Sequence, residues 1–332
     1  MLNKKLYLNP DALNSRKVEQ KHTRDGFGEG LLAAGGKDEN IVVLTADLKD
    51  STRVNLFADA YPKRFIEVGV AEQALASIAS GMANYGKIPF ISSYAIFSPG
   101  RNWEQIRTTI GIDGYPVKII GAQAGLNIGH YGVTHQGLED IALARVIPGM
   151  TVLVPLDYEE AKKATEQIAK LEGPVYMRLN RAVGPVITTS KTPFKIGNSE
   201  VLWSGKDPKV TIIGSGPILY EALLAAKELL KVSIDVMVVN CHTVKPLDEL
   251  GIIRSAKTTG AVVTLEEHQV MGGLGSAISE VLSKNFPVPM EMLGVQDRYG
   301  QSGEVKELYE EYGLTKKDVI ISVKKLLSRR GI

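Results

Sequence analysis

Glu72 is a carboxylate at the point where an apolar, strand-like run ends and a helix of small residues begins. The run covers residues 65–70, and the helix that follows is rich in alanine and serine, which would let it pack closely against a neighbour. Burying a carboxylate there is costly unless a partner takes or shares its proton. The alternative is an ordinary first-turn glutamate, which the helix dipole favours. Glu72 is therefore a candidate for proton sharing.

A loop rich in glycine and histidine follows the predicted strand Val117–Ala122. It spans Gly125–Gly137 and contains His130, Tyr131 and His135. Ligands of parallel sheets bind beyond the carboxyl ends of the strands, so this loop is a candidate substrate surface. It could equally be a polar loop whose histidines are only solvated. A metal site is less expected, because no acidic or cysteine ligands accompany the histidines at a regular spacing.

Two other strand ends carry side chains that could bind a ligand. Tyr94 and Phe97 follow one strand, three residues apart, in a chain of which only 6% is aromatic. They could stack on a flat heterocycle or simply pack into the core. Asp47 and Ser51 follow another strand in a polar turn, Thr45–Thr52, and could bind sugar hydroxyls or a phosphate, or cap the next element.

Arginines occur in two separate places that could together hold a phosphate. Arg24 precedes the first predicted helix, whereas Arg178 and Arg181 lie at the end of a predicted strand. Guanidinium groups bind phosphate as planar forks, and surface ion pairing is the alternative. The glycine-rich turns at residues 214–217 and 272–275 lack the Walker lysine spacing and the dinucleotide fingerprint, so we interpret both as structural turns.

The elements that would hold these residues alternate between helix and strand. The predicted strands are short, apolar on both faces and bounded by glycine, proline or aspartate, which indicates a buried parallel sheet in an α/β layer architecture. The predicted helices of the first unit are Gly26–Ala34, Ala71–Asn84, Arg101–Gly111, Leu138–Ala144 and Tyr158–Leu171. Its predicted strands are Ile41–Ala46, Pro89–Ser93, Val117–Ala122, Thr151–Pro155 and Val175–Leu179.

The alternation breaks after the first unit and resumes in a second, smaller one. Strands are predicted at residues 210–214, 235–240 and 261–265, and the unit closes with residues 316–328. The polar stretch between the units is typical of a linker. We therefore expect two α/β domains with mostly parallel sheets. The expected boundaries are an N-terminal arm at 1–22 that could order against a partner, a first domain at 23–187, a linker at 188–207 and a second domain at 208–332.

Composition is that of an ordinary globular protein. The 332 residues suggest about two domains, and 44% are hydrophobic and 23% charged. The net charge of +2 is small and spread along the chain, so nothing marks a nucleic-acid face or a polybasic membrane tract. The single cysteine, Cys241, excludes an internal disulfide and fits a reducing cytoplasm. We expect no signal peptide and no membrane span, since no stretch approaches ~18 apolar residues.

Seven short motifs in a fixed order resemble the C-terminal half of transketolase, in the form in which that enzyme is split into two polypeptides. The resemblance covers roughly residues 24–328. Each motif alone is weak, whereas seven in order are a strong signal. The motifs are Ala46-Asp47-Leu48, Val68-Gly69-Val70-Ala71-Glu72-Gln73, Tyr94 with Phe97, Thr134-His135-Gln136-Gly137, Thr243-Val244-Lys245-Pro246-Leu247-Asp248, Glu266-Glu267-His268 with Gly272-Gly273-Leu274-Gly275, and Asp297-Arg298-Tyr299.

The resemblance implies a thiamine diphosphate enzyme that moves a two-carbon ketol unit from a ketose phosphate to an aldose phosphate, as in the pentose phosphate pathway. The first domain would bind the pyrimidine ring, and the second would be the family's C-terminal domain. A partner subunit would hold the diphosphate and its divalent metal, Mg²⁺ or Ca²⁺, because this chain lacks the Gly-Asp-Gly motif of that site. The two chains would form a hetero-oligomer with two copies of each, α2β2 in subunit notation.

The resemblance also assigns roles to single residues. Glu72 would hydrogen-bond the aminopyrimidine ring and promote the tautomer that activates the thiazolium carbon. His135 would hydrogen-bond the donor sugar and is the second candidate catalytic residue. The other matching positions would bind the cofactor, at Tyr94, Phe97 and Asp47, or the sugar phosphate, at Arg24, Ser51 and Arg181.

Two departures from the family pattern concern the donor. His130 and Tyr131 stand between two glycines where the family commonly has Gly-Glu-Asp-Gly, and Gln123 stands where a phosphate-binding histidine is usual. A site built to hydrogen-bond one hydroxyl discriminates strongly against analogues that lack it. These three residues are therefore candidate substrate-binding positions that could alter the choice of donor.

Three alternatives stay open at this point. The β subunit of a 2-oxoacid dehydrogenase has a similar length and the same domain order, and a deoxyxylulose-phosphate synthase fragment would share much of the pattern. The Thr134–Gly137 run and the Ala46–Leu48 turn favour transketolase over the dehydrogenase. A degenerate, non-catalytic scaffold subunit is the alternative to an enzyme. The His130-Tyr131 substitution supports it, and the retained Glu72 and His135 argue against it.

Overall fold

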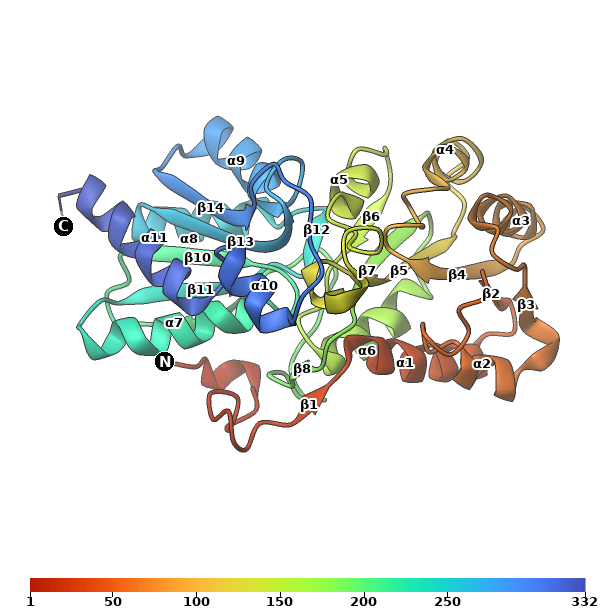
Figure 1. Ribbon diagram of the computed structural model, residues 1–332, viewed down its shortest axis with the longest axis horizontal. Helices are drawn as coiled ribbons and strands as arrows, with labels where there is room; N and C mark the ends of the chain where they lie inside the picture. Colours follow the sequence, from red (N-terminus) through yellow and green to blue (C-terminus); the bar gives the residue numbers. More distant parts are fainter. Residues whose placement is uncertain (332) are drawn as a thin grey trace.

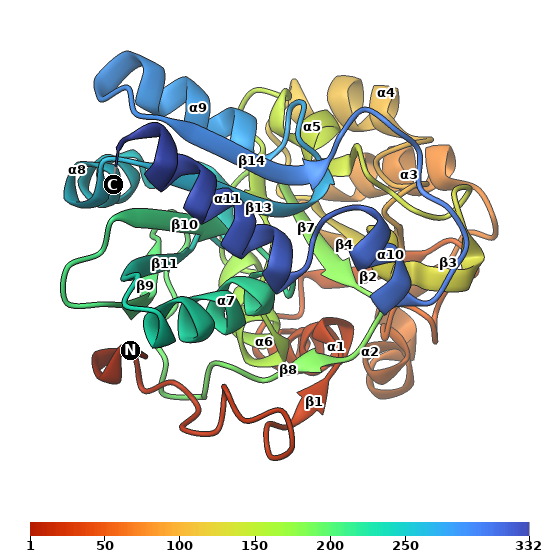
Figure 2. The same cartoon turned by 60° about the vertical axis from the view of Figure 1, so that its left-hand side comes forward.

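Two α/β units, each built around its own sheet, make up residues 1–331, which the computed structural model describes (Figure 1). Both sheets are mostly parallel and lie between layers of helices, which confirms the predicted fold class (Figures 1 and 2). None of the helices in this part of the chain combines the length and the apolarity that crossing a bilayer requires.

The first sheet has seven strands in the order β12-β6-β7-β5-β4-β2-β3, and all neighbours are parallel except β12 and β6. Its central strands are buried on both faces, as their continuous apolar sequences predict. The strands are β2 (Ile41–Thr45), β3 (Phe65–Glu67), β4 (Ile88–Tyr94), β5 (Lys118–Ala124), β6 (Thr151–Leu153), β7 (Val175–Asn180) and β12 (Thr243–Lys245).

Helices cover both faces of this sheet. One face carries α1 (Thr23–Lys37), α2 (Asn55–Ala60) and α6 (Tyr158–Ile168), and the other carries α3 (Glu72–Asn84), α4 (Trp103–Gln105), the π-helical turn Ile106–Gly111 and α5 (Asp140–Arg145) (Figure 1). Helices α1 and α6 approach so closely that a β-carbon on Gly26 would collide with the carbonyl oxygen of Tyr158. The glycines of α1 therefore permit this packing, although they weaken an isolated helix. Three 3₁₀ turns complete the connections: η1 (Lys4–Leu6), η2 (Pro62–Arg64) and η4 (Leu126–Tyr131).

The second sheet has five strands in the order β14-β13-β10-β11-β9, with only β9 antiparallel. Its strands are β9 (Glu200–Ser204), β10 (Val210–Gly214), β11 (Val236–Asn240), β13 (Val262–Gln269) and β14 (Met290–Val295). Its helices are α7 (Leu219–Lys231) and α11 (Lys316–Arg329) on one face, α8 (Glu249–Thr259) and α9 (Leu274–Asn285) on the other, and α10 (Val305–Glu311) beside the first unit (Figure 2). Strand β9 lies inside the range 188–207 that the sequence analysis assigns to a linker.

The N-terminal segment packs on its own chain. The amide of Asn3 donates to the carbonyl of Leu202 (2.8 Å), and the amide of Asn9 donates to that of Ile187 (2.8 Å). Strand β1 (Gln20–Lys21) then pairs with β8 (Gly184–Pro185), and both views show the segment beside α7 (Figures 1 and 2). The arm is thus ordered by intrachain contacts, whereas the sequence analysis suggests that it could order against a partner.

Strand β12 ties the two units together. It follows β11 of the second sheet in the chain, yet it pairs with β6 at the edge of the first sheet. One continuous apolar cluster runs through this junction and includes Val152 of the first unit and Val239 of the second. The two units therefore share a core.

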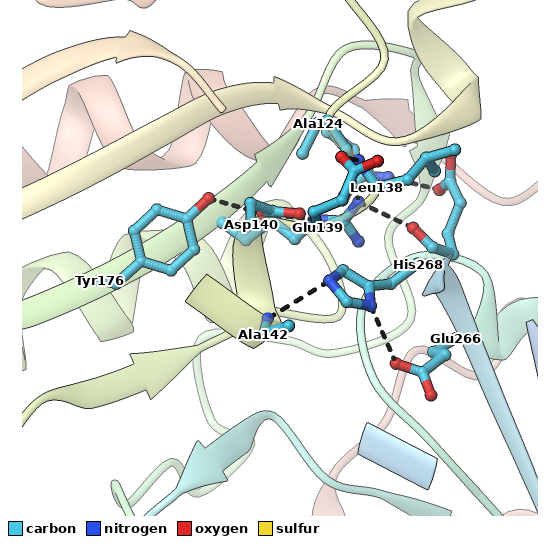
Figure 3. A network of polar contacts seen from close by, with 12 residues as sticks. Ala124, Leu138, Glu139, Asp140, Ala142, Tyr176, Glu266 and His268 are labelled. Atoms are coloured by element: carbon cyan, nitrogen blue, oxygen red, sulfur yellow. Dashed lines mark hydrogen bonds and ion pairs between the residues drawn. The ribbon is translucent and has the colours of Figure 1, made fainter. Parts of the chain in front are cut away.

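A buried polar network crosses the same junction (Figure 3). The Arg178 Nε atom lies 3.0 Å from an Asp140 carboxylate oxygen, Oδ2, and the Tyr176 hydroxyl donates to that oxygen (2.6 Å). Arg178 Nη2 donates to the backbone oxygens of Glu267 (2.7 Å) and Gly137 (3.2 Å). The suggestion that Arg178 binds phosphate is wrong, because its guanidinium is 2% exposed and engaged in this network.

His268 lies in this network as a neutral imidazole. Its Nδ1 donates to the carbonyl of Gln269 (2.6 Å), and its Nε2 accepts from the amide of Ala142 (3.4 Å). Figure 3 shows the contact to Ala142 and the approach of Nδ1 to Glu266 Oε2 (3.8 Å). A second ring proton would face the Ala142 amide proton. Burial accordingly lowers the pKa of the His268 imidazole to about 4.

We predict that the stability of the folded chain depends on pH below neutrality through His268, which lies at the junction between the two units. The unfolded chain takes up this proton near pH 6.5 and the folded chain only near pH 4, so stability is complete above pH 6.5 and declines as the pH falls. Between these pH values the wild type should lose about 3 kcal/mol more unfolding free energy than His268→Gln, which cannot titrate there. Denaturant titrations at several pH values measure this difference, and parallel curves for the two proteins would contradict it.

Candidate functional site

The carboxyl ends of five neighbouring strands bring most of the sequence-predicted site residues to one edge of the first sheet. Strands β3, β2, β4, β5 and β7 are parallel and adjacent in space, so the segments after them meet there. The residues at or just beyond these ends are Asp47 after β2, Glu72 after β3, Tyr94 and Phe97 at β4, Gln123 in β5, and Arg181 after β7.

Glu72 is the first residue of α3, one residue after the predicted start at Ala71, and its side chain is buried, with 3% of the residue exposed. The Ser93 hydroxyl donates to Glu72 Oε1 (3.0 Å). Within residues 1–331, Glu72 Oε2 accepts no hydrogen bond, and no cationic side chain pairs with the carboxyl group. A buried carboxyl group in this state can share a proton with a polar ligand that reaches it.

The turn after β4 holds the start of α3 in place. The Asn102 side-chain amide donates both to the Glu72 carbonyl (3.0 Å) and to the Ser98 hydroxyl (3.2 Å). Asn102 and Ser98 are both fully buried. Strand β4, through Ser93, and the turn that follows it therefore fix both the backbone and the carboxyl group of Glu72.

Aromatic rings form a cluster beside this turn. The Tyr94 and Phe97 rings stack with centroids 6.1 Å apart at an interplanar angle of 18°. The His135 ring lies 5.5 Å from Phe97 in an edge-on arrangement, and Tyr131 lies 5.3 Å from His135. The structure thus joins two regions that the sequence analysis treats separately, the end of β4 and the glycine-rich loop.

Ser51 brings Arg24 and Gln123 together through its backbone carbonyl. Arg24 Nη1 donates to this oxygen (3.0 Å), and Gln123 Nε2 does so as well (3.4 Å). Gln123 Oε1 is buried without a partner in residues 1–331, and the Gln123 backbone is left-handed, at φ +53°. An unpartnered buried acceptor on a strained backbone is typical of a binding site.

Three guanidinium groups give this place a positive potential. Burial lowers the pKa of Arg24, and the positive charges of Arg53 and Arg181 lower it further. Arg53 pairs with Asp25 (2.6 Å), and the Arg181 guanidinium lies 4.9 Å from the Tyr131 ring centroid. The arginine cluster, which we define as Arg24, Arg53 and Arg181, can therefore attract an anion.

Two predicted residues lie at the margin of the site. Asp47 is exposed with a left-handed backbone, at φ +59°, and its amide donates to Glu67 Oε1 (2.7 Å). The His130 ring is exposed and pairs with Glu304 of the second unit (2.8 Å), so it turns away from the aromatic cluster, whereas its neighbour Tyr131 joins it.

Several contributing residues escaped the sequence analysis. Ser93 and Asn102 lie in the same stretch as Tyr94 and Phe97. Polar residues beside the end of an apolar strand could therefore have identified them from the sequence. Arg53 gave no signal, because its position near Arg24 depends on tertiary structure. Among residues 1–331, no three histidine, cysteine, aspartate or glutamate side chains gather as metal ligands would.

Two family models match the chain. The model described as "Transketolase, pyrimidine binding domain" matches residues 19–185, and "Transketolase, C-terminal domain" matches residues 199–319. Together they cover nearly all of both α/β units.

Individual proteins are similar to the chain over nearly its whole length. The chain is 41% identical over 315 residues to the 6-deoxy-6-sulfo-D-fructose transketolase subunit SqwH of Clostridium sp. (strain MSTE9), covering 95% of this chain and 97% of that protein. It is 35% identical over 297 residues to an apulose-4-phosphate transketolase subunit of Phocaeicola vulgatus, covering 89% and 94%. A solved split-gene transketolase, described as an inactive β4 tetramer, matches with a TM-score of 0.86 and 44% identity over 92% of this chain and 98% of that chain.

Asn102→Ala should destabilise the fold by about 2 kcal/mol, because it leaves the Glu72 carbonyl and the buried Ser98 hydroxyl without their donor. Asn285→Ala is the matched control, since it removes a single side-chain bond at the exposed end of α9. Urea unfolding of the two variants and the wild type measures both effects. Equal stabilities of the two variants would show that Asn102 does not hold the start of α3.

Proposed function

The chain belongs to the transketolase family, as a C-terminal subunit with the pyrimidine-binding and C-terminal domains, and on this premise we propose that it transfers a two-carbon ketol unit from a ketose phosphate to an aldose phosphate. It is a transferase subunit that works with a partner. Membership in this family implies dependence on thiamine diphosphate. The comparisons do not favour a 2-oxoacid dehydrogenase or a deoxyxylulose-phosphate synthase.

The buried Glu72 carboxyl group is the observation that carries this proposal. It has an oxygen without a partner in the described chain and no cation paired with it, and its donor Ser93 directly precedes Tyr94 of the stacked aromatic pair. A heterocycle with a ring nitrogen fits such a place, because the nitrogen can share the carboxyl proton while the rings contact its faces. The residues present thus fit the aminopyrimidine of the cofactor.

The cofactor, when bound, supplies the nucleophilic carbon that carries the ketol unit between sugars. Glu72 would hydrogen-bond the pyrimidine nitrogen through its free oxygen, and Ser93 would orient the carboxyl group through Oε1. Tyr94 and Phe97 would pack on the pyrimidine, and Asp47 would lie at the edge of the cofactor site. His135 would hydrogen-bond the donor sugar, with its ring held by the contact between Nδ1 and the Thr134 hydroxyl (2.9 Å).

The arginine cluster would hold the anionic end of the sugar. Its guanidinium groups suit a phosphate, and they suit the sulfonate that the name of the Clostridium relative implies equally well. Ser51 and Gln123 would also line the part of the site that binds the anion. Tyr131 would make this part narrower, and His130 would lie at its margin. We place the reaction among the sugar-phosphate interconversions of the pentose phosphate pathway in the cytoplasm.

A partner subunit would complete the active site. It would carry the diphosphate-binding domain and the divalent metal, Mg²⁺ or Ca²⁺, and the assembly would contain two copies of each chain. The relative solved as a β4 tetramer is described as inactive, which supports the need for a second polypeptide. This proposal requires that the chain alone has no transferase activity.

Glu72→Gln should lower kcat of the reconstituted complex by at least about 100-fold, because glutamine cannot share a proton with the pyrimidine. The complex contains this chain, its partner, thiamine diphosphate and Mg²⁺, and transfer from xylulose 5-phosphate is followed. Glu104→Gln is the control, since Glu104 is an exposed carboxylate on α4 of the same unit. Co-purification with the partner should be unchanged. Normal turnover by Glu72→Gln would rule out the proposed role and favour a scaffold subunit.

Arg24→Ala should raise KM for a ketose phosphate by about tenfold or more, because it removes a charge-assisted contact to the anion. The KM for the same ketose without its phosphate should stay within about twofold. Steady-state kinetics with xylulose 5-phosphate and xylulose separate the two effects. An equal loss with both sugars would place Arg24 outside the anion site.

A further inference from the structure

We propose that Glu267, on β13 of the second unit, is a positioning residue for Arg181 and for the loop that faces the substrate. Only the identity of the anion that Arg181 would bind rests on the proposed function. The positioning of Arg181 is a property of the chain itself. The second unit would thereby set the geometry of the anion site without touching the sugar.

Glu267 is 2% exposed, and its carboxylate accepts hydrogen bonds on both oxygens. Oε1 accepts from the Asn127 backbone amide (2.6 Å), and Oε2 accepts from the Asn127 side-chain amide (2.9 Å). Oε2 also accepts from the Asn180 side-chain amide (2.9 Å) and the Tyr309 hydroxyl (3.0 Å). A carboxylate engaged by several donors is held in one orientation.

Asn127 connects the Glu267 carboxylate to Arg181. Its Oδ1 accepts from the backbone amides of Arg181 (2.7 Å) and Ala182 (3.1 Å). Two hydrogen bonds therefore separate the carboxylate of the second unit from the backbone of an arginine in the first unit. The Glu267–Asn127 clamp, as we name it, fixes where the Arg181 side chain starts.

The clamp holds the beginning of the glycine-rich loop, and Arg178 holds its end. Asn127 lies in η4 at its beginning, and the Glu267 carbonyl accepts from Arg178, which also donates to the carbonyl of Gly137 at its end. The amide of Gly125 closes the base of the loop onto the same Gly137 carbonyl (3.0 Å). Tyr131 and His135 lie on the loop between these ends.

Gly125 leaves room for the clamp. Its backbone is left-handed, at φ +84°, and a β-carbon there would lie 2.5 Å from Glu267 Oε1. Helix α10 covers the clamp from the second unit and packs against η4. The local sequence thus provides both the space and the donors for a carboxylate that enters from the other unit.

Glu266 provides a matched control, because it neighbours Glu267 on β13 and is equally buried. Its carboxylate instead accepts from the amides of Leu274 (2.7 Å) and Gly275 (2.8 Å), at the start of α9 in its own unit. Glu266→Gln therefore disturbs the same strand without reaching Arg181.

Hydrogen exchange tests the clamp without any assay of function. In Glu267→Gln, the side-chain NH₂ faces donors instead of accepting from them, so the Arg181 and Ala182 amides should exchange about tenfold faster than in the wild type. Asn127→Ala removes the acceptor itself and should give the same result even if Glu267→Gln folds poorly. Glu266→Gln should leave these two amides unchanged. Unaltered exchange in Asn127→Ala, or in a folded Glu267→Gln, would overturn the proposal.

Kinetics of the reconstituted complex then separate positioning from general loss of structure. Glu267→Gln should raise KM for xylulose 5-phosphate about tenfold and leave kcat and the KM for xylulose within about twofold. An equal fall in kcat for both sugars would reduce Glu267 to a structural residue. If the wild-type complex transferred no ketol unit at all, the proposed function would fail, whereas the exchange experiment would still decide whether the clamp exists.

Discussion

Burying the Glu72 carboxyl group without a cation constrains everything around it. A buried carboxyl group without a cation beside it needs hydrogen-bond donors. The fold meets this constraint with neutral groups: the Ser93 hydroxyl binds one carboxyl oxygen, and the Asn102 amide holds the backbone at the head of α3. The second oxygen of the Glu72 carboxyl group, which accepts no hydrogen bond from residues 1–331, would then face the ligand in the proposed function.

Positive charge gathers at the same edge of this sheet. The arginine cluster comes from the start of α1 and from the segments after β2 and β7. The Ser51 carbonyl accepts from Arg24, and the Arg181 guanidinium lies over the Tyr131 ring. Parallel strands bring these groups together, because every strand delivers its loop to the same edge. The proposed contact of Glu72 with the cofactor and the proposed anion site would therefore share one edge of the first sheet.

Short-range sequence patterns were sufficient to predict Glu72 at the head of a helix, because a glycine after an apolar run and a stretch of small residues define that boundary locally. Tyr94 and Phe97 were equally visible as two aromatic residues off a strand end. Arg178 was not, since an arginine inside the apolar strand Val175–Asn180 is explained only by Asp140 and the Glu267 carbonyl, which lie far away in the sequence. Strand β12 escaped for the same reason: it follows β11 in the chain and pairs with the other sheet.

The junction between the units explains why the chain carries a second domain next to a site built on the first. The proton site is supported locally, by the strand and turn that contain Ser93 and Asn102. The proposed anion site has contacts within the first unit as well, since the Ser51 carbonyl accepts from Arg24 and Gln123. The second unit adds to them through Glu267, which binds Asn127 beside Arg181. The end of the site that would bind the anion therefore draws contacts from both units, whereas the hydrogen bonds named above for Glu72 come from the first unit.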